Sequence, residues 1–245
     1  MKFGIFSHVA WPEGSSPKQA YDDKIQQVLC AEDWGFHSSW LAEHHFTRYG
    51  AISSLPQFLT YLATKTDRIR QGTAVSVLPV HDPIVLAEEF ATLDGLSNGR
   101  LDVGVGRGFS PAEDAVFSID RDQTHKMYLE SVDVNGGLWT TPGFSFHGEY
   151  HNLDNVTLVP QRVQQPHLPL YMSAYQEPLR HPLGLPKLAK GQPIRIVVRG
   201  IPGEEGNIWH TRYGGCQDQM APKYLQRSAL DRRFFGRHSG TGQGA

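Results

Sequence analysis

Apolar residues recur with two different periods along the first two thirds of this chain. Residues 2–7 form a short run of strand-forming side chains, and residues 19–34 place apolar side chains at close to helical spacing, with Gly35 positioned to end the helix. The same alternation returns in residues 38–42, which predict a strand, and in residues 55–64, which predict a helix. The first two units of the fold are therefore predicted to be a strand followed by a helix.

The alternation continues for two more units. A third strand is predicted over residues 69–78, and the helix predicted over residues 82–96 starts with a capping aspartate followed by proline. Residues 101–105 predict a fourth strand, and another helix is expected within residues 125–138. Repeated alternation of this kind requires parallel strands joined by right-handed crossovers, which predicts a doubly wound sheet or a β/α barrel.

The pattern changes twice in the rest of the chain. Residues 143–169 predict an antiparallel β excursion, after which residues 170–174 supply a fifth core strand. Beyond that point only residues 194–198 read as a strand, because Pro, Gly and Arg interrupt every amphipathic helix. If the fold is a barrel, residues 1–174 are therefore expected to be its N-terminal part, and the barrel is incomplete after its fifth strand. Residues 175–245 are expected to be an irregular tail.

Charge divides the chain at the same place. Residues 1–173 hold 12 Lys/Arg and 20 Asp/Glu and so carry −8, whereas residues 174–245 hold 11 and 5 and carry +6. Two explanations stay open for this basic tail, which is rich in Gly, Pro and Arg. It is out of register with an ancestral reading frame, or it is a divergent and partly disordered segment.

Composition narrows the class of protein. The chain is 39% hydrophobic and 20% charged, and it has no apolar run of the roughly 18 residues that a membrane span needs. Its first apolar run is too short for a signal peptide, so we expect a cytoplasmic protein that does not associate with a membrane. Cys30 and Cys216 stand in no disulfide or zinc-binding spacing. A net charge of −2 argues against nucleic acid as a partner and favours a small-molecule substrate.

The strongest candidate for chemistry is the run Glu43-His44-His45-Phe46, directly after the second predicted strand. In a β/α barrel the carboxyl ends of the strands carry the catalytic groups. Alternation along an extended strand puts His44 on one face and Glu43 with His45 on the other, so the two histidines are expected to differ in role. Histidine suits proton transfer or a hydrogen bond to a developing anion. A loop-capping histidine stays open as an alternative, and we assign no metal ligand because no metal-binding spacing is present.

A second candidate is the run Gly104-Val105-Gly106-Arg107-Gly108 at the end of the fourth predicted strand. Glycines let backbone amides approach a ligand, and Arg107 offers a bidentate partner for phosphate or carboxylate, which would suit a phosphorylated cofactor. The spacing is not that of a dinucleotide fingerprint, and a tight turn with a solvated arginine is the alternative. The small side chains of residues 73–75 offer a flat ring a place to lie against the backbone.

Together these runs resemble the bacterial luciferase-like monooxygenases over residues 1 to about 174. The resemblance rests on six motifs that occur in order: Glu43-His44-His45-Phe46, Gly72-Thr73-Ala74-Val75, Leu78-Pro79 with His81-Asp82-Pro83, Ala87-Glu88-Glu89, Leu93-Asp94 with Ser97-Asn98-Gly99-Arg100, and Gly104-x-Gly106-Arg107-Gly108. It implies an α/β fold of the TIM-type (β/α)8 barrel kind. It also implies a monooxygenase in which reduced FMN, supplied by a separate NAD(P)H flavin reductase, reacts with O2. The resulting flavin hydroperoxide would oxidise a small organic substrate such as an aldehyde.

The resemblance also implies roles for individual residues. His44 matches the family's principal catalytic histidine, expected to hydrogen-bond the oxygenated flavin or act as a general base, and His45 and Glu43 are expected to support it. The pair Ala74-Val75 matches a non-prolyl cis peptide beside the flavin ring, and Arg107 matches a phosphate-binding arginine. A homodimer that packs through the helices after strands two and three is implied as well.

Three positions depart from the family's pattern. Gly106 stands where the luciferases carry a reactive cysteine, and His125 stands where the family can place a second phosphate-binding arginine. Residues 175–178 and the tail replace the phosphate-binding loop expected after strand five. Two alternatives to the monooxygenase stay open, a non-catalytic flavin-binding protein and a deazaflavin-dependent oxidoreductase of the same fold.

Overall fold

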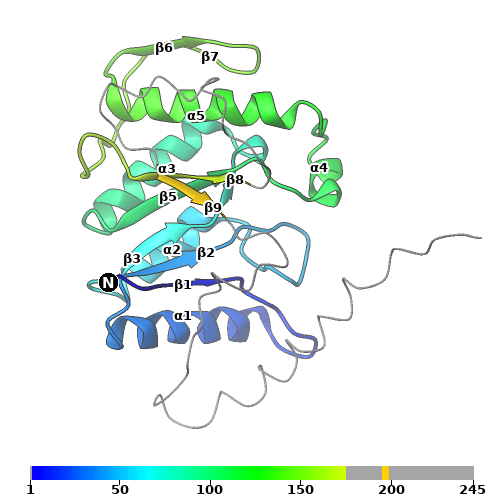
Figure 1. Ribbon diagram of the computed structural model, residues 1–245, viewed down its shortest axis with the longest axis vertical. Helices are drawn as coiled ribbons and strands as arrows, with labels where there is room; N and C mark the ends of the chain where they lie inside the picture. The colour runs from blue at the N-terminus through cyan, green and yellow to red at the C-terminus, as the bar shows by residue number, and fades with distance from the viewer. Residues whose placement is uncertain (1, 175–194, 199–245) are drawn as a thin grey trace, which may run out of the picture. The chain divides into compact units, whose positions relative to one another are not determined.

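The computed structural model describes residues 2–174 and 195–198. The chain divides into two units, and all the described residues belong to the first, Met1–Trp209. A parallel sheet runs through this unit in the strand order β1-β2-β3-β5-β8-β9 (Figure 1). Its strands are β1 (Gly4–Ser7), β2 (Ser38–Leu41), β3 (Arg70–Thr73), β5 (Leu101–Gly106), β8 (Leu170–Ala174) and β9 (Arg195–Val198). The two-residue strand β4 (Ser76–Val77) pairs with the end of β5.

The strands follow one another across the sheet in chain order, and each main strand pairs with the next in parallel. A doubly wound sheet would instead reverse its strand order at a switch point. The observed order is that of a β/α barrel, and it brings the carboxyl ends of all the strands to one edge. Residues that follow different strands can therefore meet there.

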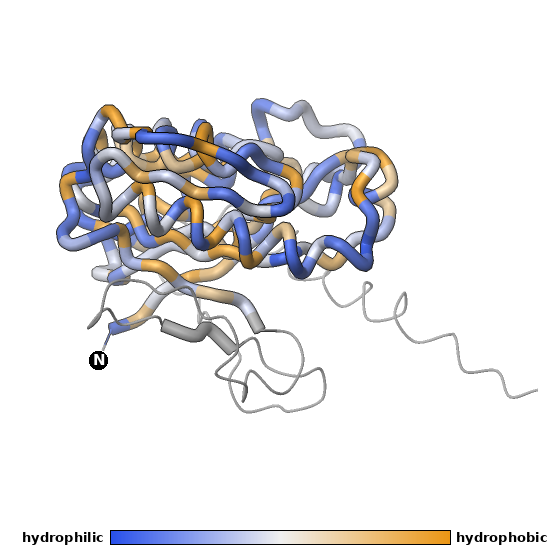
Figure 2. The backbone as a smooth tube through the Cα atoms, turned by 90° about the horizontal axis from the view of Figure 1, so that it is seen from above, coloured by the Kyte–Doolittle hydropathy of each residue, from blue (hydrophilic) through white to orange (hydrophobic). Residues whose placement is uncertain are grey.

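In the part of the chain that the structure describes, the strands are accompanied by four helices of nine or more residues: α1 (Pro17–Asp33), α2 (Leu55–Ala63), α3 (Pro83–Leu96) and α5 (Thr124–Thr140). α2 contacts β3 and α3, and α3 also contacts β5 and α5. Figure 2 shows hydrophobic and hydrophilic stretches alternating along the chain, as expected when each helix buries one side. None of the helices in the described ranges is long and apolar enough to cross a membrane.

The core lies between the sheet and these helices. Leu41 of β2, Leu59 of α2, Phe90 of α3 and Trp139 of α5 are fully buried. All six residues of β5 are buried, which is typical of a central parallel strand that is covered on both faces. The apolar run that predicted this strand is therefore explained by its place at the centre of the sheet.

Helix ends follow the local signals in the sequence. The carboxylate of Asp82 caps α3 by accepting two backbone N–H groups of the first turn. Ser16 caps α1, so this helix starts at Pro17, slightly earlier than its apolar periodicity predicts. Gly35 follows α1 with a φ of +79°, the left-handed conformation that ends a helix and favours glycine.

Two details of the predicted pattern are wrong. The single strand predicted over residues 69–78 is interrupted, since β3 ends at Thr73 and the 3-10 helix η1 (Leu78–Val80) follows β4. The interruption coincides with the peptide bond between Ala74 and Val75, which is cis. A short helix, α4 (Pro111–Val116), follows β5. It was not predicted, because six residues are too few to show helical periodicity in the sequence.

The antiparallel excursion is confirmed. β6 (Phe144–His147) and β7 (Asn152–Val156) form a separate two-stranded hairpin beside α5 (Figure 1). Glu130 of α5 holds the turn of this hairpin by accepting three backbone N–H bonds, from Glu149, Tyr150 and His151. The hairpin is thereby attached to a helix rather than to the parallel sheet.

β8 is the fifth predicted strand, and it is confirmed with the predicted bounds. β9 pairs with β8 in parallel, so the sheet continues one strand beyond the fifth, at the one place in the tail where the sequence reads as a strand. The predictions for the rest of the tail, residues 175–194 and 199–245, lie outside the described residues.

Candidate active site

The loop after β2 holds three titratable side chains in place at the carboxyl edge of the sheet. The backbone N–H of Ala42 donates to the carbonyl of Ser7 at 3.2 Å, and that of His44 donates to the carbonyl of Ile52 at 3.0 Å. The three side chains that follow Ala42 are buried: Glu43 is 3% exposed, His44 is 8% exposed and His45 is 9% exposed. Buried titratable groups with fixed backbones are typical of functional sites.

His44 is paired with a carboxylate, Glu113 of α4. Its Nδ1 lies 3.4 Å from Oε1 of Glu113, and the same oxygen accepts the backbone N–H of His45 at 3.1 Å. An ionised carboxylate only accepts hydrogen bonds, so a hydrogen bond between these two atoms requires the tautomer of His44 with its proton on Nδ1, and the neutral ring of that tautomer has its lone pair on Nε2. This pairing equips His44 to accept a proton at Nε2.

Aromatic rings surround His44. The rings of Tyr49 and Phe109 lie 5.3 Å and 5.9 Å from it, both at steep angles. The ring of His8 lies 5.3 Å away, and Nε2 of His8 is 3.1 Å from the hydroxyl of Tyr49. Tyr49 and Phe109 are each more than half exposed. They form an apolar rim beside the buried histidine.

Glu43 and His45 belong to a second cluster, which is completed by His81. Oε1 of Glu43 accepts from Nε2 of His45 at 2.9 Å and from Nε2 of His81 at 2.8 Å. Burial on its own raises the pKa of Glu43, but the two histidines lower this pKa on balance. Burial lowers the pKa of His81, whereas Glu43 raises it on balance. Glu43 and His81 therefore each stabilise the charged form of the other.

The two histidines thus have different surroundings, as strand alternation predicts. Glu43 and His45 share one cluster, and His44 belongs to another. Glu43 does not bond to His44, so any support that it gives to His44 passes through the backbone of the loop. The chemical roles of the three residues stay predictions.

The predicted cofactor-binding residues lie at the ends of β3 and β5. The peptide between Ala74 and Val75 is cis, as the resemblance implies. A Cβ atom on Gly106 would lie 2.5 Å from Cγ2 of Val75 and 2.8 Å from Oγ of Ser173, so the backbone of β5 approaches these side chains as closely as only glycine allows. The part of these residues in binding a flavin ring stays a prediction.

Arg107 and His125 stand apart from both histidine clusters. Arg107 follows β5 directly, and His125 lies in the first turn of α5. Both side chains are exposed. They are accessible to an anionic group such as a phosphate, and their predicted part in binding it stays a prediction.

Glu113 and His81 were not predicted as site residues. Ser110 and Glu113 have capping-box spacing, a signal that predicts the start of α4 but not the contact of Glu113 with His44. His81 follows the third predicted strand much as His44 and His45 follow the second. Applying the strand-end argument to every strand would have found His81.

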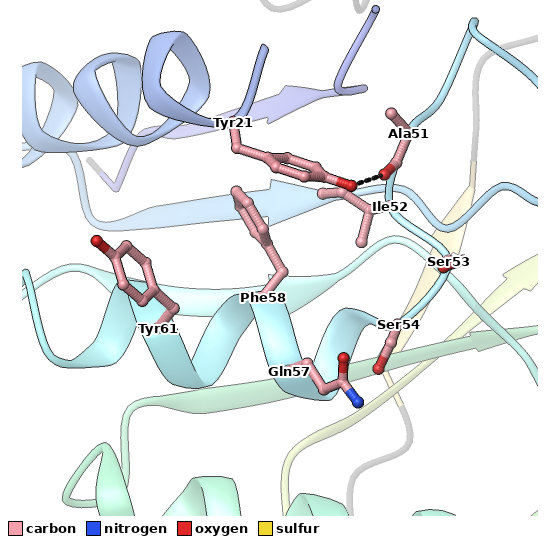
Figure 3. Close-up of a pocket in the computed structure, with 8 residues that line it drawn as sticks. All are labelled: Tyr21, Ala51, Ile52, Ser53, Ser54, Gln57, Phe58 and Tyr61. Atoms are coloured by element: carbon pink, nitrogen blue, oxygen red, sulfur yellow. Dashed lines mark hydrogen bonds between the residues drawn. The ribbon is translucent and has the colours of Figure 1, made fainter. Parts of the chain in front are cut away.

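A surface pocket between α1 and α2 lies elsewhere (Figure 3). The rings of Tyr21 and Phe58 line it at a separation of 5.6 Å, and the hydroxyl of Tyr21 donates to the carbonyl of Ala51 at 2.8 Å. Its lining contains no carboxylate, imidazole or cationic side chain. The pocket therefore lacks the groups for acid–base chemistry that surround His44.

The family model described as luciferase-like monooxygenase matches residues 1–180. The chain belongs to the luciferase-like monooxygenase family. The TIM-type β/α fold that the sequence predicts is the fold of this family's solved structures, and the parallel strand order agrees with it.

Characterised relatives share this part of the chain. The oxygenase component of the flavin-dependent trigonelline monooxygenase of Acinetobacter baylyi is 32% identical over 184 residues, which cover 74% of this luciferase-like chain and 51% of that protein. The monooxygenase RslO1 of Streptomyces bottropensis superimposes with a TM-score of 0.68 at 34% identity, covering 71% of this chain and 53% of that one.

An F420-dependent secondary alcohol dehydrogenase, solved with an F420-acetone adduct, superimposes with a TM-score of 0.59 at 25% identity and covers 71% of this chain and 52% of that one. The chain therefore spans about half the length of the relatives that it matches.

Proposed function

We propose that this chain is an FMN-dependent monooxygenase that uses O2 to oxidise a small, apolar organic substrate such as an aldehyde. The observation that carries the proposal is the buried His44, which is held by Glu113 at the same edge of the sheet as the cis peptide and Gly106. The names of the two monooxygenase relatives support it, and one of them is flavin-dependent.

In this proposal Ala74, Val75 and Gly106 would hold the ring of FMN, and Arg107 and His125 would hold its phosphate. The planar guanidinium of Arg107 suits a phosphate, and His125 adds a second donor. Bound in its reduced form, FMN supplies the activation of O2, while the protein supplies binding, proton control and exclusion of water.

His44 takes up and returns protons at Nε2. Glu113 keeps the ring in the tautomer that this requires and stabilises the positive charge of the protonated ring. Tyr49 and Phe109 offer the substrate apolar contacts next to His44. A separate NAD(P)H flavin reductase would deliver the reduced flavin, and the description of the trigonelline relative as an oxygenase component supports such a partner.

A second candidate function is a deazaflavin-dependent oxidoreductase, because one similar structure is an F420-dependent dehydrogenase. Both functions need a flat cofactor at the strand ends and a histidine that handles a proton. They differ in their need for oxygen. A third possibility is that the chain binds flavin without turnover.

The test mixes the purified chain, anaerobically reduced FMN and a small apolar aldehyde, and then admits O2. We expect carboxylic acid to form, and we expect His44→Ala to lower the acid yield by about 100-fold while H2O2 release rises. His147→Ala changes an exposed histidine of β6 and is expected to leave the yield unchanged. An unchanged yield in His44→Ala would remove this histidine from the mechanism. FMN binding without product favours the non-catalytic protein. Oxidation of a secondary alcohol to a ketone, with oxidised F420 in place of FMN as the hydride acceptor and without O2, favours the dehydrogenase.

A further inference from the structure

Three metal-ligating atoms come together at the carboxyl edge of the sheet, from Glu43, His45 and His81. Oε1 of Glu43 lies 2.9 Å from Nε2 of His45 and 2.8 Å from Nε2 of His81, and the ligand atoms of all three residues lie within 4.8 Å of one another. Two ligands come from the loop after β2, and the third is the residue directly after η1. Sequence spacing does not predict this site because its ligands lie on separate segments.

One oxygen of the cluster lacks a partner. Glu43 is 3% exposed, and within the described part of the chain its Oε2 has no hydrogen-bond partner. A buried carboxylate oxygen without a partner is unusual, and an ion near it is one explanation. Glu89 of α3 interacts electrostatically with both Glu43 and His81, so a second carboxylate adds negative charge to the region.

Two imidazoles and one carboxylate are a ligand set that suits Zn²⁺ and its divalent neighbours, whereas Mg²⁺ and Ca²⁺ prefer oxygen ligands. Metal–ligand bonds of about 2.0–2.1 Å in a tetrahedral arrangement separate neighbouring ligand atoms by roughly 3.3 Å. Each histidine would therefore move away from Glu43 by about 0.5 Å, and the two imidazole nitrogens, which lie within 4.8 Å of each other, would come to the same separation of roughly 3.3 Å. The proton on each Nε2 would move to Nδ1 or leave to solvent, because the metal needs the lone pair on Nε2.

We propose that Glu43, His45 and His81 bind one divalent transition-metal ion, for which Zn²⁺ is the best match, and that this ion fixes the loop after β2 to the end of η1. Three protein ligands leave a fourth position for water. His44 is not a ligand, since it is paired with Glu113. The metal site does not depend on flavin binding, and it can be tested without measuring turnover.

The experiment strips the purified full-length chain with a chelator and titrates it with CoCl2, because Co²⁺ replaces Zn²⁺ and has visible d–d absorption in protein sites. We expect absorption that saturates at one equivalent and disappears when Zn²⁺ is added. His81→Gln and Glu43→Gln should each weaken Co²⁺ binding by on the order of 100-fold. His147→Gln, which changes an exposed histidine that pairs with Asp154, is the matched control and should bind Co²⁺ as the parent chain does.

X-ray absorption at the zinc edge gives a second measurement that needs no variant, so a variant that fails to fold does not decide the outcome. We expect nitrogen and oxygen ligands only, with two imidazoles. Absence of the Co²⁺ spectrum in the parent chain would overturn the proposal. A sulfur ligand, from Cys30 or Cys216, a single imidazole, or undiminished binding in a folded His81→Gln chain would overturn it as well.

Discussion

At the scale of single residues, Glu113 serves the ring of one histidine and the backbone of the next with the same oxygen. Oε1 is 3.4 Å from Nδ1 of His44 and 3.1 Å from the backbone nitrogen of His45. Loss of this carboxylate would free the ring to turn and would leave a buried N–H without an acceptor. Glu113 is therefore a positioning residue in the proposed reaction.

Glu113→Ala is expected to lower kcat for aldehyde oxidation by about 10- to 100-fold with a smaller change in KM, because the ring of His44 loses its orientation. Glu113→Gln should keep more activity, since an amide oxygen can still accept the bond from the backbone of His45. Steady-state kinetics of the two variants check this. The control is Glu149→Ala, which removes an exposed carboxylate beside Lys126. Equal kcat in Glu113→Ala and the parent chain would contradict the positioning role.

Gly106→Ala is expected to destabilise the protein by about 1–3 kcal/mol, because a new Cβ would lie 2.5 Å from Cγ2 of Val75 in a fully packed strand end. Urea unfolding followed by circular dichroism measures this loss. Gly95→Ala is the matched control, since the structure has nothing within 4 Å of a Cβ at Gly95. Alanine at this helical position should instead stabilise by up to about 1 kcal/mol. Similar losses in both variants would argue against the close approach at Gly106.

At the scale of elements, periodicity located the long helices because each of them buries one side over several turns, and the apolar run of β5 located a strand that is buried on both faces. Periodicity failed where tertiary structure decides. The peptide between Ala74 and Val75 divides the third predicted strand, although its residues are as strand-like as their neighbours. α4 is one short helix after a capping serine, and its six residues are too few to show a period.

Glu32 joins two elements, since its carboxylate accepts backbone N–H bonds from the three residues that lead into β3 (Asp67, Arg68 and Ile69). Burial on its own raises the pKa of Glu32, but these amides lower it on balance. The folded protein therefore favours the ionised form of Glu32. Stability from this group is present above the ordinary glutamate pKa of 4.5 and is lost as the pH falls below it.

Glu32→Ala should therefore lower the free energy of unfolding by about 1–3 kcal/mol near pH 7, because one buried N–H group (that of Ile69) and two partly buried ones lose their acceptor. The difference from the parent chain should shrink as the pH falls below about 4. Denaturant unfolding over a pH series measures it. Asp33→Ala, which changes the exposed neighbour, should show neither effect. A difference that does not vary with pH would mean that the charge of Glu32 is not involved.

At the scale of the whole described region, the site depends on contacts that no local pattern contains. His44 and Glu113 are 69 positions apart, and Glu43 and His81 are 38 positions apart. The strand-end argument predicted the edge at which these residues meet, because parallel strands bring their carboxyl ends together. It did not predict the pairs, since these depend on which loops turn toward each other.

The family resemblance also implies that two copies of the chain form a homodimer through the helices after strands two and three, α2 and α3. Tyr61 of α2 and Leu96 of α3 are 50% and 62% exposed, and large apolar residues on a surface favour association. We expect the chain to sediment as a dimer and the double variant Tyr61→Glu/Leu96→Glu to sediment as a monomer in analytical ultracentrifugation. Val159→Glu changes a residue that is 72% exposed outside these helices and should leave the dimer intact. A dimer that survives the double variant would exclude this face.

Neighbouring histidines with different carboxylate partners also limit how this loop can be redesigned. Inserting a single residue before Glu43 would turn each side chain of an extended segment to the opposite side, so that His44 would turn away from Glu113, and Glu43 with His45 would turn away from His81. An engineer who wishes to admit a bulkier substrate should therefore keep the loop at its present length. Replacing Tyr49 or Phe109 would widen the entrance and leave both histidine pairs intact.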